Sequence, residues 1–538
     1  MSPFDRRLRL LEQPGANATL DGILRGLEKE SLRVDSGGCL SQRPHPPALG
    51  SALTHPSITT DYSEALLEFI TPPSTSVAAT LAALDQLHRF TYGVLDDELL
   101  WVNSMPCVLG RDEDIPVARY GTSNIGRMKT VYRVGLGHRY GRLMQTISGI
   151  HYNWSLPDAT WTILHAAEAA PGESLRDYKT RRYFDLIRNF RRYFWLLLYL
   201  FGAAPAVCRT FVQGRPHRLV PFGADQHSLH TPHATSLRMG DLGYQSQAQQ
   251  QLGICYNGLD SYLEHLRRGL TTPYPAYEAI GVRDASGEYR QLSAGLLQIE
   301  NEFYSTIRPK RPGVGGEVPL QALRRRGVEY IEVRCVDLNP YEPNGIEPTQ
   351  IRFLDMFLLF CLLGDSQPTD EAEYRLLQAN QLDVVYRGRD PGLALEILGR
   401  RQPLRDWARE LFVALAPLAA LLDRAQHTEA HAAALRMLAA RIDDSSTTPA
   451  ARLLAEMKDT GQTYFQTALG HAERNRDHFL SVPLAAETLA GLREQAAQSL
   501  RDQAALEAGD RQSFESFLAA YYAQYGDARN GLDTKAGS

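Results

Sequence analysis

Five short stretches of this chain resemble buried β-strands, yet each is interrupted by acidic, basic or imidazole side chains. They are GLEKESLRV (26–34), EALLEFIT (64–71), SGIHYNWSLP (148–157), LLQIENEFY (296–304) and EYIEVRCVDLNP (329–340). Because long segments separate them, the pattern favours an antiparallel sheet of sequence-distant strands over a regular strand-helix repeat. Beyond about residue 360, Ala, Leu, Arg and Glu recur at helical spacing. The sequence therefore predicts an α+β fold with a helical C-terminal region.

The carboxylates within these stretches suggest a site for hard cations. Alternate residues of a strand face the same side, so Glu28 and Glu30 should project together, about 7 Å apart. The same period places Tyr330, Glu332 and Arg334 on one face. Magnesium prefers oxygen ligands and often retains substrate phosphates as partners, so such faces could hold metal-bound ATP. A solvated strand face remains the alternative for Glu28 and Glu30.

Two further side chains stand in apolar surroundings. Glu68 lies between Leu67 and Phe69, where a carboxylate is costly unless it is paired or bound to a metal. A structural salt bridge is the alternative for Glu68. His151 shares its strand face with Asn153, which favours a contact with metal or phosphate over the usual role of a satisfied core histidine.

The sequence lacks both G-x-x-x-x-G-K-[ST] and G-x-G-x-x-G, the commonest loops that hold nucleotide phosphates. Any phosphate clamp must therefore come from side chains. Arg308, Lys310 and Arg311 of IRPKRPG are candidates, and a solvated turn is the alternative.

Composition limits the function classes. A formal charge of −5, with 43% hydrophobic and 22% charged residues, gives no basic excess for nucleic acid or an anionic membrane.

We expect no signal peptide. The apolar run 193–208 is too short to span a bilayer, so it predicts a buried helix. The six scattered cysteines are typical of reduced thiols. His227, His230 and His233 follow no zinc motif and indicate a histidine-bearing loop. These features favour a cytoplasmic enzyme.

The chain is expected to divide into two regions. Residues 1–365 carry the strand-like segments and should form the catalytic region. Residues 366–538 should form a mainly helical region packed on it, with a frayed tail from about residue 528.

Several longer segments closely resemble the bacterial type of the glutamate-cysteine ligase family. The resemblance runs from about residue 20 to residue 360. The segments are RGLEKESLRV, LGSALTHPSITTDYSEALLEFITP, YGTSNIGRMKTVYRVGLGHRYGRLMQTISGIHYNWSLP, ATSLRMGDLGY, LQIENEFYSTIRPKRP and EYIEVRCVDLNP. The histidine-rich stretch RPHRLVPFGADQHSLHTPHATS is unlike the family pattern.

The resemblance implies a fold and a reaction. The fold would be like that of glutamine synthetase, with a curved, mainly antiparallel sheet forming an active-site funnel and helices packed outside. ATP would phosphorylate the γ-carboxylate of L-glutamate, and the amine of L-cysteine would attack the acyl phosphate, giving γ-glutamylcysteine, ADP and phosphate. This is the first step of glutathione biosynthesis. A related ligase that joins glutamate to another amine is one alternative, and a non-catalytic nucleotide- or metal-sensing protein is another.

The resemblance also assigns site residues. It implies two or three Mg²⁺ ions, for which Mn²⁺ can substitute, glutathione as feedback inhibitor, and a monomer. The catalytic set would be Arg334, which faces the transferring phosphate, with Glu28 and Glu332. The implied metal ligands are Glu28, Glu30, Glu68, His151 and Glu332. The implied substrate-binding residues are Tyr62, Tyr132, Gln145, Arg238, Tyr244 and Tyr304.

Overall fold

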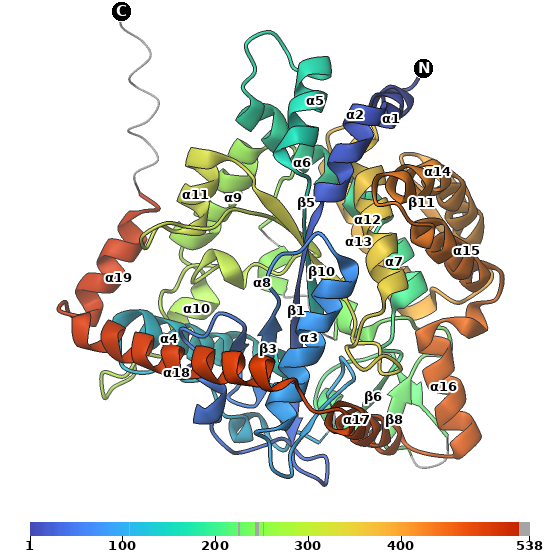
Figure 1. The fold of residues 1–538 in the computed structure, drawn as a ribbon. Helices are drawn as coiled ribbons and strands as arrows, with labels where there is room; N and C mark the ends of the chain where they lie inside the picture. The colour runs from blue at the N-terminus through green and yellow to red at the C-terminus, as the bar shows by residue number, and fades with distance from the viewer. Residues whose placement is uncertain (107, 224–225, 243–246, 251, 527–538) are drawn as a thin grey trace, which may run out of the picture.

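The structure is a computed structural model that describes residues 1–106, 108–223, 226–242, 247–250 and 252–526 (Figure 1). Of the residues singled out above, Tyr244 and the tail from residue 528 lie outside this described part.

A seven-stranded sheet forms the centre of the molecule, and every neighbouring pair within it is antiparallel. Its strand order is β2-β3-β1-β5-β10-β9, and β4 also pairs with β1. This arrangement confirms the predicted antiparallel sheet of sequence-distant strands. The strands are β1 (Leu24–Val34), β2 (Ile58–Thr60), β3 (Leu66–Ile70), β4 (Leu99–Leu100), β5 (Ile150–Ser155), β9 (Ile307–Lys310) and β10 (Tyr330–Val336).

Four of the five predicted strands are present, as β1, β3, β5 and β10, but the prediction for residues 296–304 is wrong. That stretch forms a short 3-10 helix, η7 (Glu300–Glu302), and β9 occupies the sheet edge beside β10. Glu302 accepts hydrogen bonds from Arg139 (2.9 Å) and Tyr140 (2.7 Å), and Glu300 accepts one from Tyr525 (2.5 Å). Side chains of α4 thus hold Glu302, a residue just after α19 holds Glu300, and the chain turns there instead of extending.

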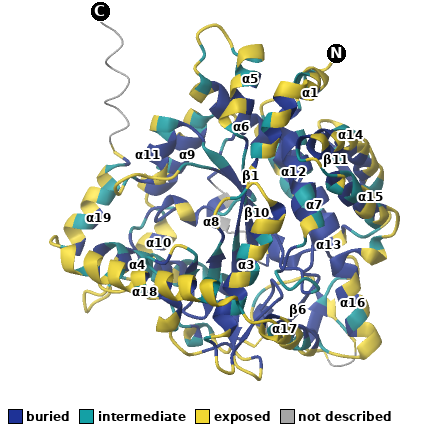
Figure 2. Ribbon diagram, in the orientation of Figure 1, coloured by how far each residue is buried: buried dark blue, intermediate teal, exposed yellow. Residues whose placement is uncertain are grey.

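Helices cover the sheet, and their outward faces carry most of the exposed residues, whereas the strands are buried (Figure 2). Polar residues mark helix starts: the Ser123 hydroxyl, for example, accepts a hydrogen bond from the Gly126 N–H at the start of α4. The helices up to residue 363 are α1 (Pro3–Glu12), α2 (Pro14–Asn17), α3 (Val77–Tyr92), α4 (Asn124–Tyr140), α5 (Asp158–Glu168), α6 (Leu175–Tyr193), α7 (Trp195–Phe201), α8 (Gln247–Gln250), α9 (Leu259–Thr271), α10 (Pro275–Ile280), α11 (Pro319–Arg326) and α12 (Pro348–Leu363). Helix α7 lies within the apolar run that predicted a buried helix.

The C-terminal region is helical, as predicted, and it wraps around the sheet (Figure 1). Helices α14 and α15 pack on α12, α17 and α18 contact α3, and α19 packs on α4. The division at residue 365 stays a prediction. These helices are α13 (Glu371–Arg387), α14 (Leu404–Ala425), α15 (Ala430–Asp443), α16 (Pro449–Thr460), α17 (Tyr464–Ser481), α18 (Ala486–Gly509) and α19 (Phe514–Ala523).

Two small sheets complete the fold. One has the order β6-β8-β7, and the other is the hairpin β11-β12. In the described part of the chain, no helix combines the length and apolar character needed to cross a membrane. Cys39, Cys255, Cys335 and Cys361 are free, but Cys208 is disulfide-bonded, which corrects the expectation of a reduced thiol there. The small strands are β6 (Ala206–Cys208), β7 (Val220–Pro221), β8 (Ser228–His230), β11 (Ala394–Ile397) and β12 (Arg400–Pro403).

Buried polar groups connect the sheet to the helices behind it. Arg25 of β1 forms an ion pair with Asp355 of α12 (2.7 Å), and both side chains are fully buried. Tyr152 of β5 donates to the same carboxylate at 2.7 Å. Lys29 also faces the helices, and its Nζ lies 2.6 Å from Nε2 of His88 on α3. These contacts hold α3 and α12 against the face of the sheet opposite to the face that carries Glu28 and Glu30.

Lys29→Met should stabilise the protein. Burial lowers the pKa of Lys29 to about 7. Between pH 7 and about 10 the unfolded chain therefore binds more protons at this residue, so stability of the native protein should rise with pH. Replacing Lys29 with Met removes the free-energy cost of burying an ammonium group, but it leaves His88 without its partner. We therefore expect the free energy of unfolding to rise by about 2 kcal/mol at pH 7.

Urea denaturation at pH 7.0 and pH 9.5 measures this effect. The difference in midpoint between the two pH values should shrink in Lys29→Met. The exposed Lys458 on α16 supplies the control, because Lys458→Met should leave both midpoints unchanged. A pH dependence in Lys29→Met equal to that of the unmodified protein would contradict the assignment.

Candidate active site

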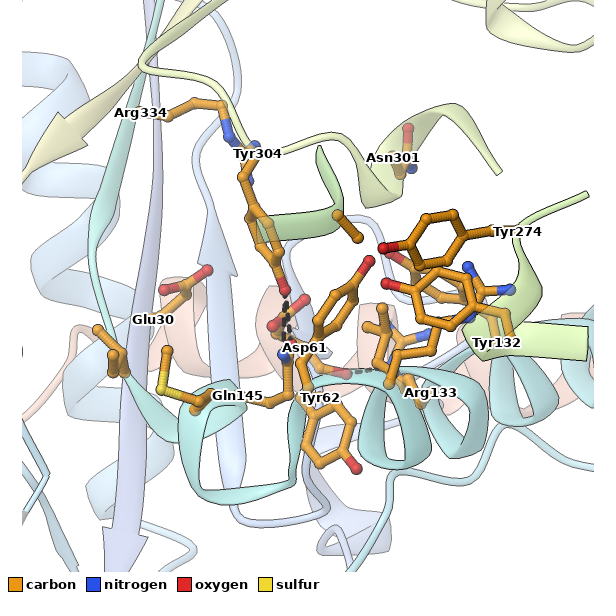
Figure 3. A pocket seen from close by; sticks show the side chains of 17 residues that line it. Glu30, Asp61, Tyr62, Tyr132, Arg133, Gln145, Tyr274, Asn301, Tyr304 and Arg334 are labelled. Atoms are coloured by element: carbon orange, nitrogen blue, oxygen red, sulfur yellow. Dashed lines mark hydrogen bonds between the residues drawn. The ribbon is translucent and has the colours of Figure 1, made fainter. Parts of the chain in front are cut away.

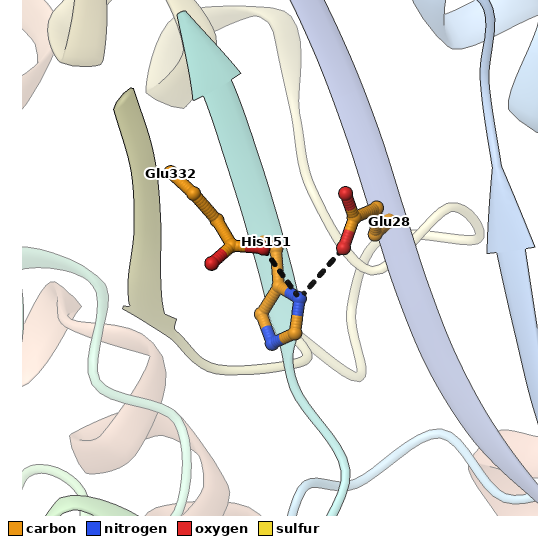
Figure 4. A group of neighbouring side chains, drawn as sticks. All are labelled: Glu28, His151 and Glu332. Atoms are coloured by element: carbon orange, nitrogen blue, oxygen red, sulfur yellow. Dashed lines mark hydrogen bonds and ion pairs between the residues drawn. The ribbon is translucent and has the colours of Figure 1, made fainter. Parts of the chain in front are cut away.

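Three adjacent strands bring Glu28, His151 and Glu332 together on one face of the sheet (Figure 4). His151 Nδ1 lies 2.9 Å from Glu28 Oε2 and 3.8 Å from Glu332 Oε1. One potential ligand atom from each of the three residues lies within 4.8 Å of the others. Among the described residues this is the only such group of three, so the structure gives no support for a zinc site at the histidine-rich stretch.

The chemistry of this group fits a divalent cation. The Nε2 atom of His151 is buried and has no hydrogen-bond partner among the described residues. Burial would raise the pKa of Glu28, but the hydrogen bond with His151, together with nearby positive charge that includes Lys310, outweighs burial and lowers that pKa. Two carboxylates with an imidazole are a ligand set that suits hard to borderline divalent metals.

Glu30 and Glu68 add two more carboxylates beside this group. They are directly opposite in the β1-β3 ladder. Burial raises the pKa of Glu30, and burial together with the charges of Glu28 and Asp61 raises that of Glu68 well above its usual value. Within the described chain Glu68 makes no ion pair, so the predicted alternative of a structural salt bridge is not found. Glu30 is 4% exposed, which excludes the alternative of a solvated strand face for this residue, and Glu28 is half-buried.

Cationic side chains line the other side of the acidic group. Lys310 Nζ lies 3.2 Å from Glu332 Oε1, and Arg334 Nη1 lies 3.1 Å from Glu332 Oε2. Burial would raise the pKa of Glu332, but the charges of Lys310 and Arg334 outweigh it and hold that pKa well below its usual value. Arg308 faces Glu332 across the β9-β10 ladder. Arg311 points elsewhere, donating to the carbonyls of residues 326 and 327, so the geometry lends no support to its predicted phosphate contact.

Two cavities open onto this face. The larger, of about 730 Å³, is lined by Glu28, Glu68, His151 and Glu332, together with Arg308 and Lys310. The smaller, of about 360 Å³, receives Glu30 and a set of tyrosines (Figure 3). Glu28 and Glu30 therefore share a strand face, as predicted, but line different cavities. The residues that line both cavities are Asp61, Tyr132, Arg133, Asn301 and Arg334.

The smaller cavity gathers most of the predicted substrate-binding residues. Tyr62, Tyr132, Gln145 and Tyr304 all line it. Gln145 Nε2 donates to the Tyr304 hydroxyl at 3.0 Å (Figure 3). Arg238 is different: it is fully buried, lines neither cavity and donates to the backbone carbonyl of residue 334 at 2.8 Å. The structure thus places Arg238 behind the strand that carries Arg334.

Apart from Tyr132, sequence reasoning missed the wall that α4 contributes to both cavities. Met128 lines the larger cavity, Tyr132 lines both, and Leu136 and Arg139 line the smaller one. Their spacing of three to four residues is the period of one helix face, which is the signal that could have found them. Asp61 had no such signal, because it lies in a loop after β2. The other missed lining residues of the smaller cavity include Arg133, Tyr140, Tyr274, Tyr277 and Asn301.

The chain is similar to known proteins along nearly its whole length. A model of the glutamate-cysteine ligase family matches residues 8–384. A glutamate-cysteine ligase of Alcanivorax borkumensis is 53% identical over 526 residues, which cover 97% of this chain and 100% of the relative. One from Azotobacter vinelandii is 52% identical over 522 residues, covering 97% and 98%.

A solved structure agrees with these relatives. The crystal structure of a glutamate-cysteine ligase from Francisella tularensis in complex with AMP superposes with a TM-score of 0.88 at 37% identity, and the match covers 94% of this chain and 98% of that one. The sequence, the curved antiparallel sheet and the acidic group on its face all lead to one assignment. This chain belongs to the glutamate-cysteine ligase family.

Proposed function

We propose that this protein uses ATP to join the γ-carboxylate of L-glutamate to the amine of L-cysteine. The observation that carries the proposal is the junction of the two cavities at Arg334. A cavity with acidic and cationic walls suits metal-bound ATP, and the adjoining tyrosine-lined cavity suits a small amino acid. Arg334 lines both, so a phosphoryl group passing from one to the other would lie beside its guanidinium. The names of the relatives and the AMP bound to the Francisella enzyme support this proposal.

The acidic face would bind magnesium. We assign Glu28, His151 and Glu332 as its first ligands, with Glu30 and Glu68 completing a set for two or three ions, and Mn²⁺ able to replace Mg²⁺. When bound, such ions neutralise phosphate charge and align phosphate oxygens. The high pKa of Glu68 in the absence of a cation is consistent with this role, because a nearby cation favours the ionised carboxylate.

The protein's own side chains would then hold the reacting groups. Lys310 and Arg308 would bind the phosphates of ATP, and Arg334 would stabilise the charge that develops on the transferring phosphoryl group. Tyr132 and Tyr304 would contact the cysteine acceptor by ring and hydroxyl, which is how tyrosines commonly bind a small amino acid. Arg238 would keep β10 in position behind Arg334.

The remaining parts of the proposal concern the enzyme in its cell. We infer that it acts as a monomer in the cytoplasm and that glutathione inhibits it by feedback. These inferences rest on the family resemblance. Inhibition by glutathione that competes with glutamate, and one particle of about 60 kDa by light scattering, are the expected results.

Phosphate release with ATP, Mg²⁺ and glutamate over a panel of amines tests the substrate assignment. Cysteine and its close analogue 2-aminobutyrate should give the highest kcat/KM. If another amine leads the panel, the protein is a related carboxylate-amine ligase with a different acceptor. If no amine stimulates phosphate release, the protein is not a ligase.

A further inference from the structure

A third pocket adjoins the smaller active-site cavity, and Tyr304 is the only described residue that lines both. Its volume is about 100 Å³, against about 360 Å³ for the smaller cavity, so it suits only a small molecule. None of the described residues that line it also lines the larger cavity. Helices α6 and α13 and the segment 303–306 supply most of its walls, and the proposed reaction uses none of the lining residues except Tyr304.

Arg191 of α6 brings a guanidinium group to this pocket without an acidic partner. Its Cζ atom lies 4.7 Å from the ring centre of Tyr256 and 4.7 Å from that of Tyr374. No described residue forms an ion pair or a hydrogen bond with it, whereas its helix neighbours Arg188 and Arg192 pair with carboxylates. The rings hold the guanidinium through cation–π contacts, so its N–H donors remain for a ligand or for water.

The lining of this pocket matches a small carboxylate better than a phosphate. Among the described residues that line it, Arg191 is the only cation, and none is acidic. One guanidinium balances the single charge of a carboxylate, whereas a phosphate dianion would keep an uncompensated charge beside apolar walls. Phe194, Met239 and Leu377 are buried apolar residues of these walls, which suit a short aliphatic tail. The lining therefore fits a monocarboxylate of a few carbon atoms.

Two residues connect this pocket to the smaller cavity, which is proposed above to hold the amine acceptor. Tyr304 lines both, and its hydroxyl accepts a hydrogen bond from Gln145 in the smaller cavity at 3.0 Å. Gln249 lines the third pocket, accepts from the N–H of Tyr304 at 2.8 Å and donates to the hydroxyl of Tyr140 at 3.2 Å. Tyr140 in turn lines the smaller cavity. A ligand in the third pocket would therefore lie against the groups that hold Tyr304 in place.

We propose that the third pocket is an effector site, which binds a small monocarboxylate at Arg191 and raises the affinity for the amine acceptor through Tyr304. The binding follows from the lining of the pocket, and the effect on the acceptor rests on the proposed function of the smaller cavity. An occupant would hold the segment 303–306 in the position in which Tyr304 meets Gln145. Each of the two ligands should then strengthen the binding of the other by the same factor.

Propionate tests the binding, with propionamide as its uncharged match. In the full-length protein, ligand-observed NMR should detect binding of propionate and none of propionamide. Arg191→Gln should weaken propionate binding at least about 10-fold, whereas Arg375→Gln, on the exposed surface of α13, should leave it unchanged. Propionate binding that is equally strong in Arg191→Gln, or no binding to the unmodified protein, would overturn the proposal. Tighter binding of inorganic phosphate than of propionate at Arg191 would reject the carboxylate class.

A second pair of variants blocks the pocket by bulk and leaves Arg191 in place. Gln378 lines the pocket, whereas the next residue of α13, Ala379, is exposed and does not line it. Gln378→Trp should therefore fill the pocket and abolish propionate binding, and Ala379→Trp should preserve it because its ring would lie in solvent. Equal effects of the two variants, whether both keep or both lose the binding of propionate, would overturn the proposal.

Acceptor kinetics separate this site from the proposed reaction. Saturating propionate should lower the KM for cysteine at least about 5-fold in the unmodified protein and should have no effect on it in Arg191→Gln. Propionate binding at Arg191 in a protein that ligates no amine would support the site and reject the ligase function. Ligation of cysteine without any propionate binding would reject the site alone. Propionate binding with an unchanged KM for cysteine would reject the effect through Tyr304.

Discussion

Arg334→Ala should reduce ATP turnover by at least about 10³-fold while leaving the fold intact. The side chain lines both cavities and its Nη1 lies 3.1 Å from Glu332 and 3.4 Å from His151 Nδ1. No other arginine of the described chain combines a place in both cavities with contact to the acidic group. Loss of the guanidinium charge would remove stabilisation of the negative charge on the phosphoryl group, and this stabilisation is largest in the transition state of the transfer.

Turnover should be measured as phosphate release with saturating ATP, glutamate and cysteine. The thermal midpoint of unfolding should change little in Arg334→Ala. Backbone hydrogen bonds hold β10 beside β9, and Lys310 still neutralises the charge of Glu332. Arg375→Ala supplies the control, because that arginine lies exposed on α13 and should be silent. Near-normal turnover in Arg334→Ala would remove the proposed phosphate role.

Glu28→Gln should raise the Mg²⁺ concentration needed for half-maximal activity by at least about 10-fold. The change retains the size of the side chain and an oxygen that can accept from Asn153 Nδ2, now at 2.8 Å, but it removes the carboxylate charge beside His151. Because carboxylates supply most of the attraction for a hard cation, we expect weaker metal binding. The loss of activity should be smaller at saturating metal than at low metal concentration.

A magnesium titration of activity measures this change, and Mn²⁺ should restore more activity than Mg²⁺, since an imidazole remains in the set. Glu329→Gln is the matched control: Glu329 precedes β10 but pairs with Arg311 outside the cavities. An unchanged titration for Glu28→Gln would count against the proposed metal site.

The strand period explains how much of the site could be predicted. Alternation alone placed Glu28 with Glu30, and Glu332 with Arg334, on common faces, and the structure has both pairs there. It could not tell that residues 296–304 turn instead of extending, because Arg139 and Tyr140, which hold Glu302, come from a helix more than 150 residues earlier. A pattern within one segment carries no information about such partners.

The sequence by itself determined the sheet strands that carry the acidic groups, the helical C-terminal region and, through its longer motifs, the family. Side-chain alternation and helical period are local properties, so they can be recognised without the fold. Tertiary structure alone decided which strands are neighbours, and hence that Glu28, His151 and Glu332 meet. It also placed α19, near the end of the chain, against the cavity whose other walls come from residues 28–334. Contacts between such distant segments depend on how whole elements pack, which no local pattern encodes.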